Sequence, residues 1–195
     1  MKTIIYNLLM PVYSIFYRLR YRPTIIGKEN IPKNGPIIMC GNHKHTRDQM
    51  NVMIVTRRVI HYMAKEEYFE GKFAWFFKLA GCIKVDRRIH DEEAKKTALK
   101  YLNEGGAVGI FPEGTRNKTI GTKDEVDLLP FKYGAVSLAK KSNALIVPFG
   151  ISGDYTGRKG KLVCTIGKPF SVSDMNLEEA NELLRKNILK LMKNK

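Results

Sequence analysis

The chain has 195 residues, of which 44% are hydrophobic, and this content excludes an intrinsically disordered protein. Its 34 lysine and arginine residues against 19 aspartate and glutamate residues give a net charge of +15. Such an excess predicts an anionic partner: a nucleic acid, an anionic lipid surface or a phosphorylated ligand. The three cysteines are scattered through apolar segments, which argues against a disulfide framework or a zinc site.

Residues 2–22 predict an amphipathic helix. Apolar residues recur there with helical spacing, at Ile4, Ile5, Leu8, Leu9, Val12, Ile15, Phe16 and Leu19. The apolar stretch would span roughly 21 Å as a helix, too short for a hydrocarbon core of about 30 Å. Arginines stand where a cleaved signal peptide has small residues. We therefore expect a helix that lies in a membrane interface, with a helix packed on the core as the alternative.

After this helix, apolar runs alternate with helical patterns. Strands are expected at 36–40, 59–64, 81–85, 107–111, 145–151 and 161–166. Helices are expected at 49–55, 91–103 and 131–139, and at the end of the chain after a cap at Ser173 or Asp174. A polar loop is expected over 117–127. The alternation predicts an α/β fold, with a mixed sheet flanked by helices in a single domain over residues 23–195, preceded by the helix of residues 1–22.

Residues 65–79 are rich in aromatic side chains with lysines between them. Two interpretations remain open for this segment. It forms either a buried pair of helices or a second surface that faces a membrane or an acyl chain. Interleaved aromatics and lysines also suit base stacking, so this segment alone does not exclude a nucleic-acid partner.

Three polar clusters each follow an apolar run: residues 43–48, 86–88 and 113–116. In an α/β sheet, chemistry collects at the loops beyond one set of strand ends. We therefore expect the three clusters to meet at one edge of the sheet.

The first cluster holds His43 and Asp48, five positions apart where a strand gives way to a helix. A backbone that turns there brings the carboxylate onto one imidazole nitrogen and leaves the other free as a base. The alternative is an aspartate that caps the helix and a histidine on the surface.

Taken together, short motifs in this order resemble those of the glycerophospholipid acyltransferases, and most of all the 1-acylglycerol-3-phosphate (lysophosphatidate) acyltransferases. They are Asn42-His43 with Asp48, Gly81-x-Ile83 with Arg87, the unbroken Phe-Pro-Glu-Gly-Thr-Arg of residues 111–116, Lys132-x-Gly134-Ala135, and Val147-Pro148. The family commonly has a small residue, often Ser, two positions after the histidine. His45 stands there instead, and a second imidazole competing for Asp48 is one interpretation of it.

The resemblance implies a role for each motif. His43 would be the general base and Asp48 would orient it. The substrate phosphate would meet Arg87, Glu113, Gly114, Thr115, Arg116 and Lys132, with Glu113 ordering the loop and its arginine. Lys84 and Arg88 are expected to form a solvated basic face. A covalent route through Cys40 is a remote alternative, since an apolar strand favours an inert thiol.

The resemblance also implies an enzyme that acylates the sn-2 hydroxyl of lysophosphatidate and makes phosphatidate. The donor would be acyl-CoA or acyl-carrier protein, and neither a metal nor a further cofactor is needed. Glycerol-3-phosphate and a lyso-ornithine lipid are alternative acceptors. The expected location is the cytoplasmic face of the cell membrane, as a peripheral or monotopic protein on an anionic surface, with no nucleic-acid partner. A basic protein that binds nucleic acid or lipid is the non-enzyme alternative.

Overall fold

The computed structural model describes residues 2–72, 74–89, 91–117, 128–159 and 161–193, and for residues 2–7 the backbone alone. In this part of the chain, seven strands form one sheet in the order β1-β7-β6-β2-β5-β3-β4. The strands are β1 (Thr24–Ile26), β2 (Ile37–Gly41), β3 (Ile60–Lys65), β4 (Ile83–Val85), β5 (Ala107–Ile110), β6 (Leu145–Gly153) and β7 (Leu162–Ile166). Strand β7 runs antiparallel to β6, whereas the other neighbouring pairs are parallel. The predicted α/β fold with a mixed sheet is thus confirmed.

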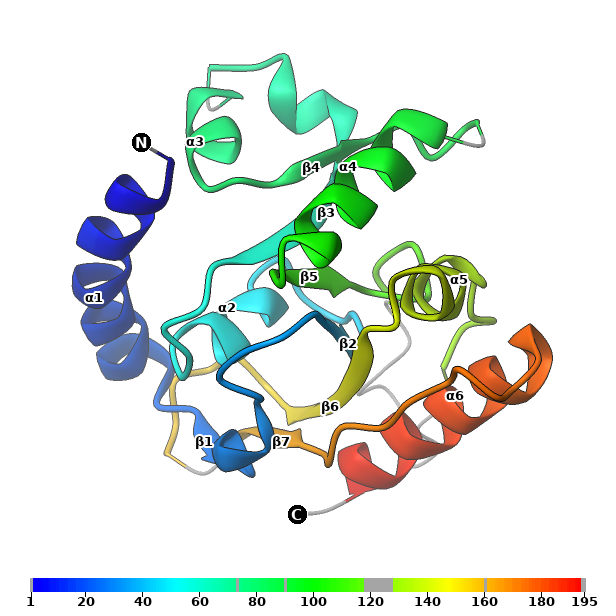
Figure 1. Ribbon diagram of the computed structural model, residues 1–195. Coiled ribbons are helices and arrows are strands. Elements are labelled where there is room, and N and C mark those ends of the chain that lie inside the picture. The colour runs from blue at the N-terminus through cyan, green and yellow to red at the C-terminus, as the bar shows by residue number, and fades with distance from the viewer. Residues whose placement is uncertain (1, 73, 90, 118–127, 160, 194–195) are drawn as a thin grey trace.

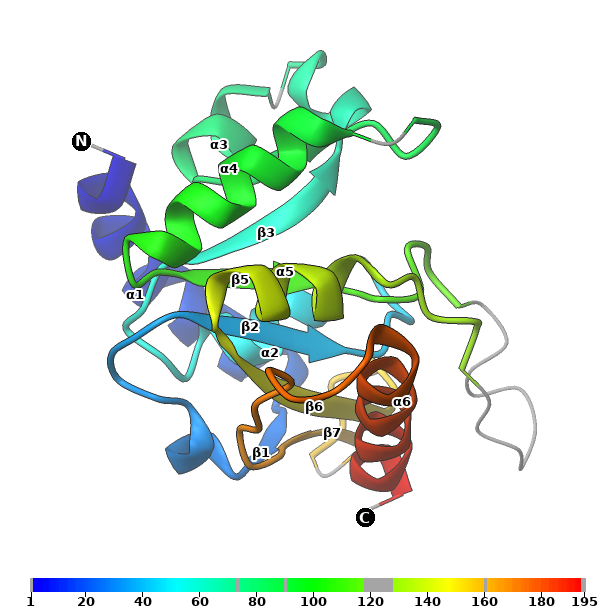
Figure 2. The same ribbon diagram turned by 45° about the vertical axis from the view of Figure 1, so that its right-hand side comes forward.

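Helices cover both faces of this sheet (Figures 1 and 2). They are α1 (Lys2–Tyr21), α2 (Asp48–Met53), α3 (Ala74–Leu79), α4 (Glu92–Asn103), α5 (Gly134–Ser142) and α6 (Leu177–Lys193), with short 3₁₀ turns η1 (Lys28–Asn30) and η2 (Glu66–Phe69). Along β2, Ile38 and Cys40 join the core under α4, α5 and α6, whereas Ile37 and Met39 join the core on the α1 and α2 side. Both sets of side chains are buried because each face of the strand is covered, which explains the unbroken apolar run.

Three predictions of local structure were wrong. Helix α5 begins at Gly134 and not at residue 131, because Phe131 is buried in the core and the N–H of Lys132 donates to the carbonyl of Pro112. Helix α2 begins at Asp48 and ends at Met53, whereas residues 49–55 were expected to form it. The cap of α6 is Asn176, whose side chain accepts from the N–H of Glu179 while the Glu179 carboxylate accepts from the N–H of Asn176. Of the expected polar loop, residues 118–127 lie outside the described residues.

The apolar side chains of α1 face away from the sheet. Their exposed fractions run from 48% to 71% for Leu8, Leu9, Val12, Ile15, Phe16 and Leu19. The opposite side of the helix packs on the core through Tyr17 and Tyr21, which are buried. The helix therefore does pack on the core, as in the alternative, but its apolar stripe is not the side that packs there. The side chains of Ile4 and Ile5 are outside the described part.

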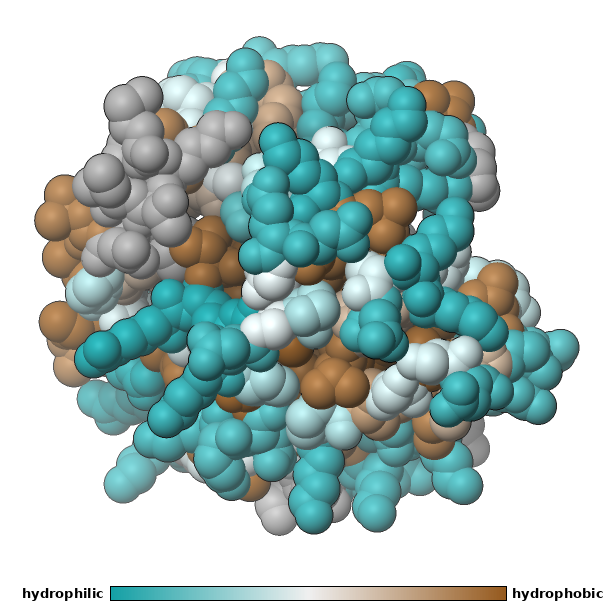
Figure 3. All heavy atoms as spheres, in the orientation of Figure 1, coloured by the Kyte–Doolittle hydropathy of each residue, from teal (hydrophilic) through white to brown (hydrophobic). Residues whose placement is uncertain are grey.

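Helix α3 contacts α1 and extends this surface. Trp75 and Phe76 are 57% and 47% exposed, and no residue of α3 is buried, so the buried-helix interpretation of residues 65–79 is also wrong. Figure 3 shows apolar side chains at the edge where α1 lies in Figure 1. Among the described residues, the helices fall short of the length and apolar content needed to cross a bilayer.

Candidate active site

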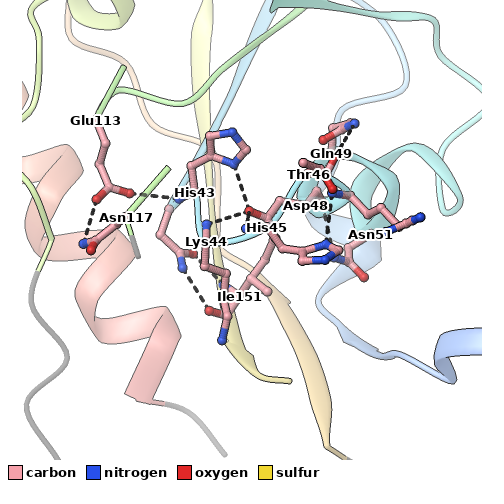
Figure 4. Close-up of polar contacts among 12 residues, drawn as sticks. His43, Lys44, His45, Thr46, Asp48, Gln49, Asn51, Glu113, Asn117 and Ile151 are labelled. Atoms are coloured by element: carbon pink, nitrogen blue, oxygen red, sulfur yellow. Dashed lines mark hydrogen bonds and ion pairs between the residues drawn. The ribbon is translucent and has the colours of Figure 1, made fainter. Parts of the chain in front are cut away.

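The loop that follows β2 brings His43 and Asp48 together, as the spacing predicts (Figure 4). Nδ1 of His43 lies 2.9 Å from Oδ2 of Asp48. The Asp48 side chain is fully buried, and that of His43 is 14% exposed. A carboxylate accepts hydrogen bonds, so the proton lies on Nδ1 and Nε2 is left as the basic nitrogen. The arrangement is that of an oriented general base.

The same carboxylate also folds the loop. Oδ2 of Asp48 accepts from the backbone N–H groups of Lys44 and His45, at 2.7 Å each. Asp48 is the first residue of α2, where a negative side chain is stabilised by the helix dipole. The capping alternative and the catalytic interpretation are therefore compatible, because one carboxylate orders the turn and holds His43.

A second buried carboxylate ties this loop to the loop after β5. Oε1 of Glu113 accepts from the backbone N–H of His43 at 2.8 Å. Oε2 accepts from the side chain of Asn117 at 3.1 Å and from the N–H of Leu129 at 3.0 Å. Burial raises the pKa of Glu113, while its three hydrogen bonds act in the opposite direction. Glu113 thus orders the loop, as expected. Its oxygens accept from donors of the protein, and among the described residues Arg116 is not one of them.

The residue before His43 is fixed as firmly. Asn42 is buried, and its side-chain amide exchanges two hydrogen bonds with the backbone of Ile151 in β6, at 2.9 and 2.7 Å. The amide therefore replaces a peptide group of the ladder at the point where the chain leaves β2. This explains why an asparagine precedes the histidine.

Aromatic rings support the imidazole from below. The His43 ring stacks on Phe111 with centroids 4.1 Å apart, and Phe111 stacks in turn on Tyr62 at 5.6 Å. Gly109 of β5 makes room for the Tyr62 ring, because a Cβ at position 109 would lie 2.4 Å from it. The rings shield one face of the base from water and set its height above the sheet.

The predicted phosphate ligands lie on the loops after β4 and β5. Strands β2, β5, β3 and β4 are parallel neighbours, so their carboxyl ends share one edge with His43. Arg87 and Arg116 are exposed, and each has no ion pair among the described residues. Burial lowers the pKa of Arg87; the charges of Tyr68 and Glu67 act in the opposite direction, and that of Arg116 adds a smaller lowering. A guanidinium group has the planar geometry that matches the oxygens of a phosphate.

Two neighbouring cations, Arg88 and Lys84, are in ion pairs with carboxylates of the protein. Arg88 forms ion pairs with Glu66 and with Asp86, and Lys84 lies 3.9 Å from Glu66. These contacts agree with the expected solvated basic face. Cys40 is fully buried in the core under α4, α5 and α6, and burial raises the pKa of its thiol, which counts against a covalent route.

The Gly-Thr-Arg turn brings one more cation toward the site. Gly114 has a φ of +69°, a conformation that favours glycine. An added Cβ would meet Lys132 Cε at 3.0 Å, so the lysine side chain lies against this turn. The N–H of Gly114 already donates to the carbonyl of Phe111 at 2.9 Å. Thr115, the next residue of the turn, is exposed.

Sequence reasoning missed Tyr155 and Asn51. The Tyr155 hydroxyl donates to Oδ1 of Asp48 at 2.5 Å, and it accepts from the Asn51 amide at 2.9 Å. Tyr155 also explains His45, whose ring stacks on it with centroids 4.1 Å apart. Nδ1 of His45 accepts from the N–H of Arg47. The side chain of His45 thus does not compete for Asp48.

Comparisons with known proteins agree with the motifs. A family model described as Acyltransferase matches residues 22–152. The chain is 34% identical over 167 residues to the 1-acyl-sn-glycerol-3-phosphate acyltransferase of Bacillus subtilis, covering 83% of this chain and 80% of that protein. It is 30% identical over 179 residues to the protein of the same name from Saccharomyces cerevisiae, covering 83% of this chain and 56% of that protein.

The fold is similar to a solved structure. This is the crystal structure of the 1-acyl-sn-glycerophosphate (LPA) acyltransferase PlsC from Thermotoga maritima, with a TM-score of 0.71 at 22% identity. The match covers 97% of this chain and 79% of that one. At this identity the likeness is one of fold.

Proposed function

Because the chain belongs to the acyltransferase family, we propose that it transfers a fatty acyl group from an acyl thioester to the sn-2 hydroxyl of lysophosphatidate. The relatives from Bacillus subtilis and Saccharomyces cerevisiae carry the name of that activity. The observation that supports the proposal most directly is the 2.9 Å contact between His43 Nδ1 and Asp48 Oδ2. The donor is an acyl thioester of coenzyme A or of acyl-carrier protein.

In this mechanism, Nε2 of His43 removes the proton of the acceptor hydroxyl. The hydroxyl oxygen attacks the thioester carbonyl carbon and forms the new ester bond. The carbon–sulfur bond breaks, and the sulfur leaves with the proton that His43 carried. Asp48 keeps the imidazole in the required tautomer and stabilises its positive charge. General base assistance of this kind contributes about 10² to 10⁴ in rate.

The phosphate of the acceptor binds the cations of the later loops. Arg87 and Arg116 supply planar groups that match phosphate oxygens, and Lys132 adds a charge beside the Gly114 turn. The phosphate anchors the lipid while its free hydroxyl reaches His43. This role applies equally to glycerol-3-phosphate, so the acceptor must be tested directly.

The surface formed by α1 and α3 suits a bilayer interface. Exposed apolar side chains of both helices would enter the headgroup region, and each nearby lysine or arginine adds about 1 kcal/mol against anionic lipid. We place the protein on the cytoplasmic face of the membrane, as a peripheral or monotopic enzyme, because both substrate and product are lipids.

The test of the enzymatic proposal is an acyl-transfer assay with purified protein and either donor. Lysophosphatidate, glycerol-3-phosphate and a lyso-ornithine lipid are offered in turn, and the product is identified by mass spectrometry. We expect transfer to lysophosphatidate, and a loss of at least about 10² in kcat for His43→Ala. The matched control is His61→Gln, a histidine outside the site. Transfer to none of the three acceptors by folded wild-type protein would contradict the proposal.

The membrane placement is tested by flotation with liposomes. We expect wild-type protein to float with anionic liposomes at low salt, and Ile15→Asp to float less. The control is Leu177→Asp, which places the same charge at an exposed leucine of α6. Wild-type protein that stays with the soluble fraction would exclude this placement.

A further inference from the structure

Tyr155 lies just beyond β6 and reaches across to the carboxylate behind His43. Its hydroxyl donates to Oδ1 of Asp48 at 2.5 Å, although the two residues are 107 positions apart. Oδ2 of the same carboxylate holds His43 and two backbone N–H groups. Among the described residues, Tyr155 is the hydrogen-bond partner of Oδ1. The two oxygens therefore have separate tasks.

The position of the Tyr155 hydroxyl is itself fixed. The Asn51 amide donates to it at 2.9 Å, and the Asn51 carbonyl oxygen accepts from the hydroxyl of Tyr17 in α1 at 3.1 Å. The hydroxyl thus accepts from one side and donates to the other. Its proton has one direction available, toward Asp48.

The Tyr155 ring is held between two other rings. His45 stacks on it at 4.1 Å with an interplanar angle of 21°, and Tyr21 of α1 meets it edge-on at 5.7 Å. The residue is thereby fixed by the loop after β2 and by the N-terminal helix. This half-buried ring, with its hydroxyl bonded on both sides, cannot turn without breaking these contacts.

We propose that Tyr155 is a positioning residue of the acyl transfer, which fixes Oδ1 of Asp48 so that Oδ2 faces Nδ1 of His43. This inference rests on the proposed function, because it assigns a task within the His43–Asp48 pair. Tyr155 acts through Asp48 and does not touch the reacting atoms. Asn51 and Tyr17 support it from behind.

The hydrogen bond also sets the strength of the base. The Tyr155 hydroxyl withdraws negative charge from Asp48, so Asp48 stabilises the protonated form of His43 less. Burial and the charge of Asp48 raise the pKa of Tyr155, so the hydroxyl keeps its proton throughout the working range. Removing the hydroxyl should therefore let Asp48 stabilise the imidazolium more and move the acid limb of the pH–rate profile to higher pH.

Other titratable groups near the pair stay in place in Tyr155→Phe. They are Lys44, His45, Arg47, Glu113, Arg116, Asp154, Tyr17 and Cys164. A shift in this variant therefore reports the lost hydroxyl, since the phenylalanine ring keeps the stack with His45.

The experiment compares Tyr155→Phe with wild type in kcat, in KM for lysophosphatidate and in the pH dependence of kcat/KM. The control is Tyr101→Phe, a tyrosine outside the site whose ring also stacks on a histidine, at 3.6 Å from His61. We expect kcat on the pH plateau to fall about tenfold in Tyr155→Phe, with KM little changed. The acid limb should move up by roughly half a pH unit or more. Tyr101→Phe should match wild type in all three.

A second readout is independent of turnover. Histidine-labelled protein has four imidazoles, and His43→Ala identifies the signal of His43 by NMR. The pKa of that signal should rise in Tyr155→Phe. If Tyr155→Phe melts below the assay temperature, Asn51→Ala carries the test, with a smaller shift in the same direction.

The outcomes separate the inference from the proposed function. Wild-type kcat and an unshifted acid limb in Tyr155→Phe, with His43→Ala inactive, would overturn the inference and leave the proposed function intact. Full activity in His43→Ala would overturn both the positioning role of Tyr155 and the proposed role of His43 as the general base. An unshifted His43 signal in Tyr155→Phe would overturn the electrostatic coupling whatever the activity.

Discussion

The loop after β2, which carries His43 and Asp48, and the arginines of the loops after β4 and β5 lie at one edge of the sheet, but their side chains are bonded in opposite ways. In the first, Asp48 is fully buried and both of its oxygens are bonded within the protein. In the others, Arg87 and Arg116 are exposed and have no ion pair among the described residues. In the proposed mechanism, the base is oriented before the substrate arrives, whereas the phosphate would bring its own charge to the cations. Pre-formed ion pairs at Arg87 or Arg116 would have to be broken on binding.

The largest effect is expected from breaking the internal contacts of the first loop. In Glu113→Gln, an amide N–H₂ must face at least one of the donors that the carboxylate now accepts from. A buried donor without a partner costs about 1–3 kcal/mol, which in a protein of this size lowers Tm by roughly 2–4 °C per kcal/mol. Activity should fall as well, because the backbone of His43 loses its anchor.

Thermal unfolding and kcat measure this effect. The control is Glu67→Gln, whose side chain is 61% exposed and pairs with Lys65. A Glu113→Gln variant as stable and active as Glu67→Gln would show that the first loop does not depend on internal hydrogen bonds.

A smaller effect is expected from the exposed cations, and two adjacent arginines provide the test. Arg87→Ala should raise KM for lysophosphatidate about tenfold with little change in kcat, because it removes a phosphate contact. Arg88→Ala should leave KM unchanged, because Arg88 is already paired with Glu66 and Asp86. Equal KM values for the two variants would remove the distinction between paired and unpaired cations.

The smallest effect concerns His45. Burial lowers its pKa below the ordinary value of 6.5, with the charge of Asp48 acting the other way. Between the lowered pKa and 6.5, the unfolded chain binds more protons than the folded protein, so stability rises with pH through this window and is lost as pH falls.

His45→Phe keeps a ring against Tyr155 and removes this titration. The slope of Tm against pH just below 6.5 should therefore be shallower in the variant than in wild type. An unchanged or steeper slope would mean that His45 is charged in the folded protein, contrary to its place in the first loop.

Six of the seven strands and the His43–Asp48 contact could be predicted from the sequence because they depend on local patterns, whereas the short edge strand β1 was missed. Apolar runs marked the strands, and a spacing of five residues across a turn marked the pair. The cap of α6 was open to prediction as well, since Asn176 followed three residues later by Glu179 is a capping box. Ser173 and Asp174, the residues expected to cap the helix, are also of cap type and precede Asn176.

Tyr155 could not be predicted in this way. Its contact with Asp48 depends on β6 and β2 pairing in register, and no local pattern marks a tyrosine 107 positions away. The exposure of α3 was equally hidden, because its aromatic residues are as typical of a buried helix as of a surface one. Burial of such a segment depends on what packs against it, which is a property of the tertiary structure.

The rings beneath His43 have one more consequence. Tyr62 fits under Phe111 because Gly109 has no side chain, and an added carbon there would come within 2.4 Å of the tyrosine ring. A displaced Tyr62 presses on Phe111, which carries the imidazole. A shift of the Tyr62 ring would therefore displace Phe111 and, through it, the imidazole of His43. Gly109 lies within the sheet and has no side chain, yet it determines where the His43 ring can lie. Variants limited to polar residues would not reveal this dependence.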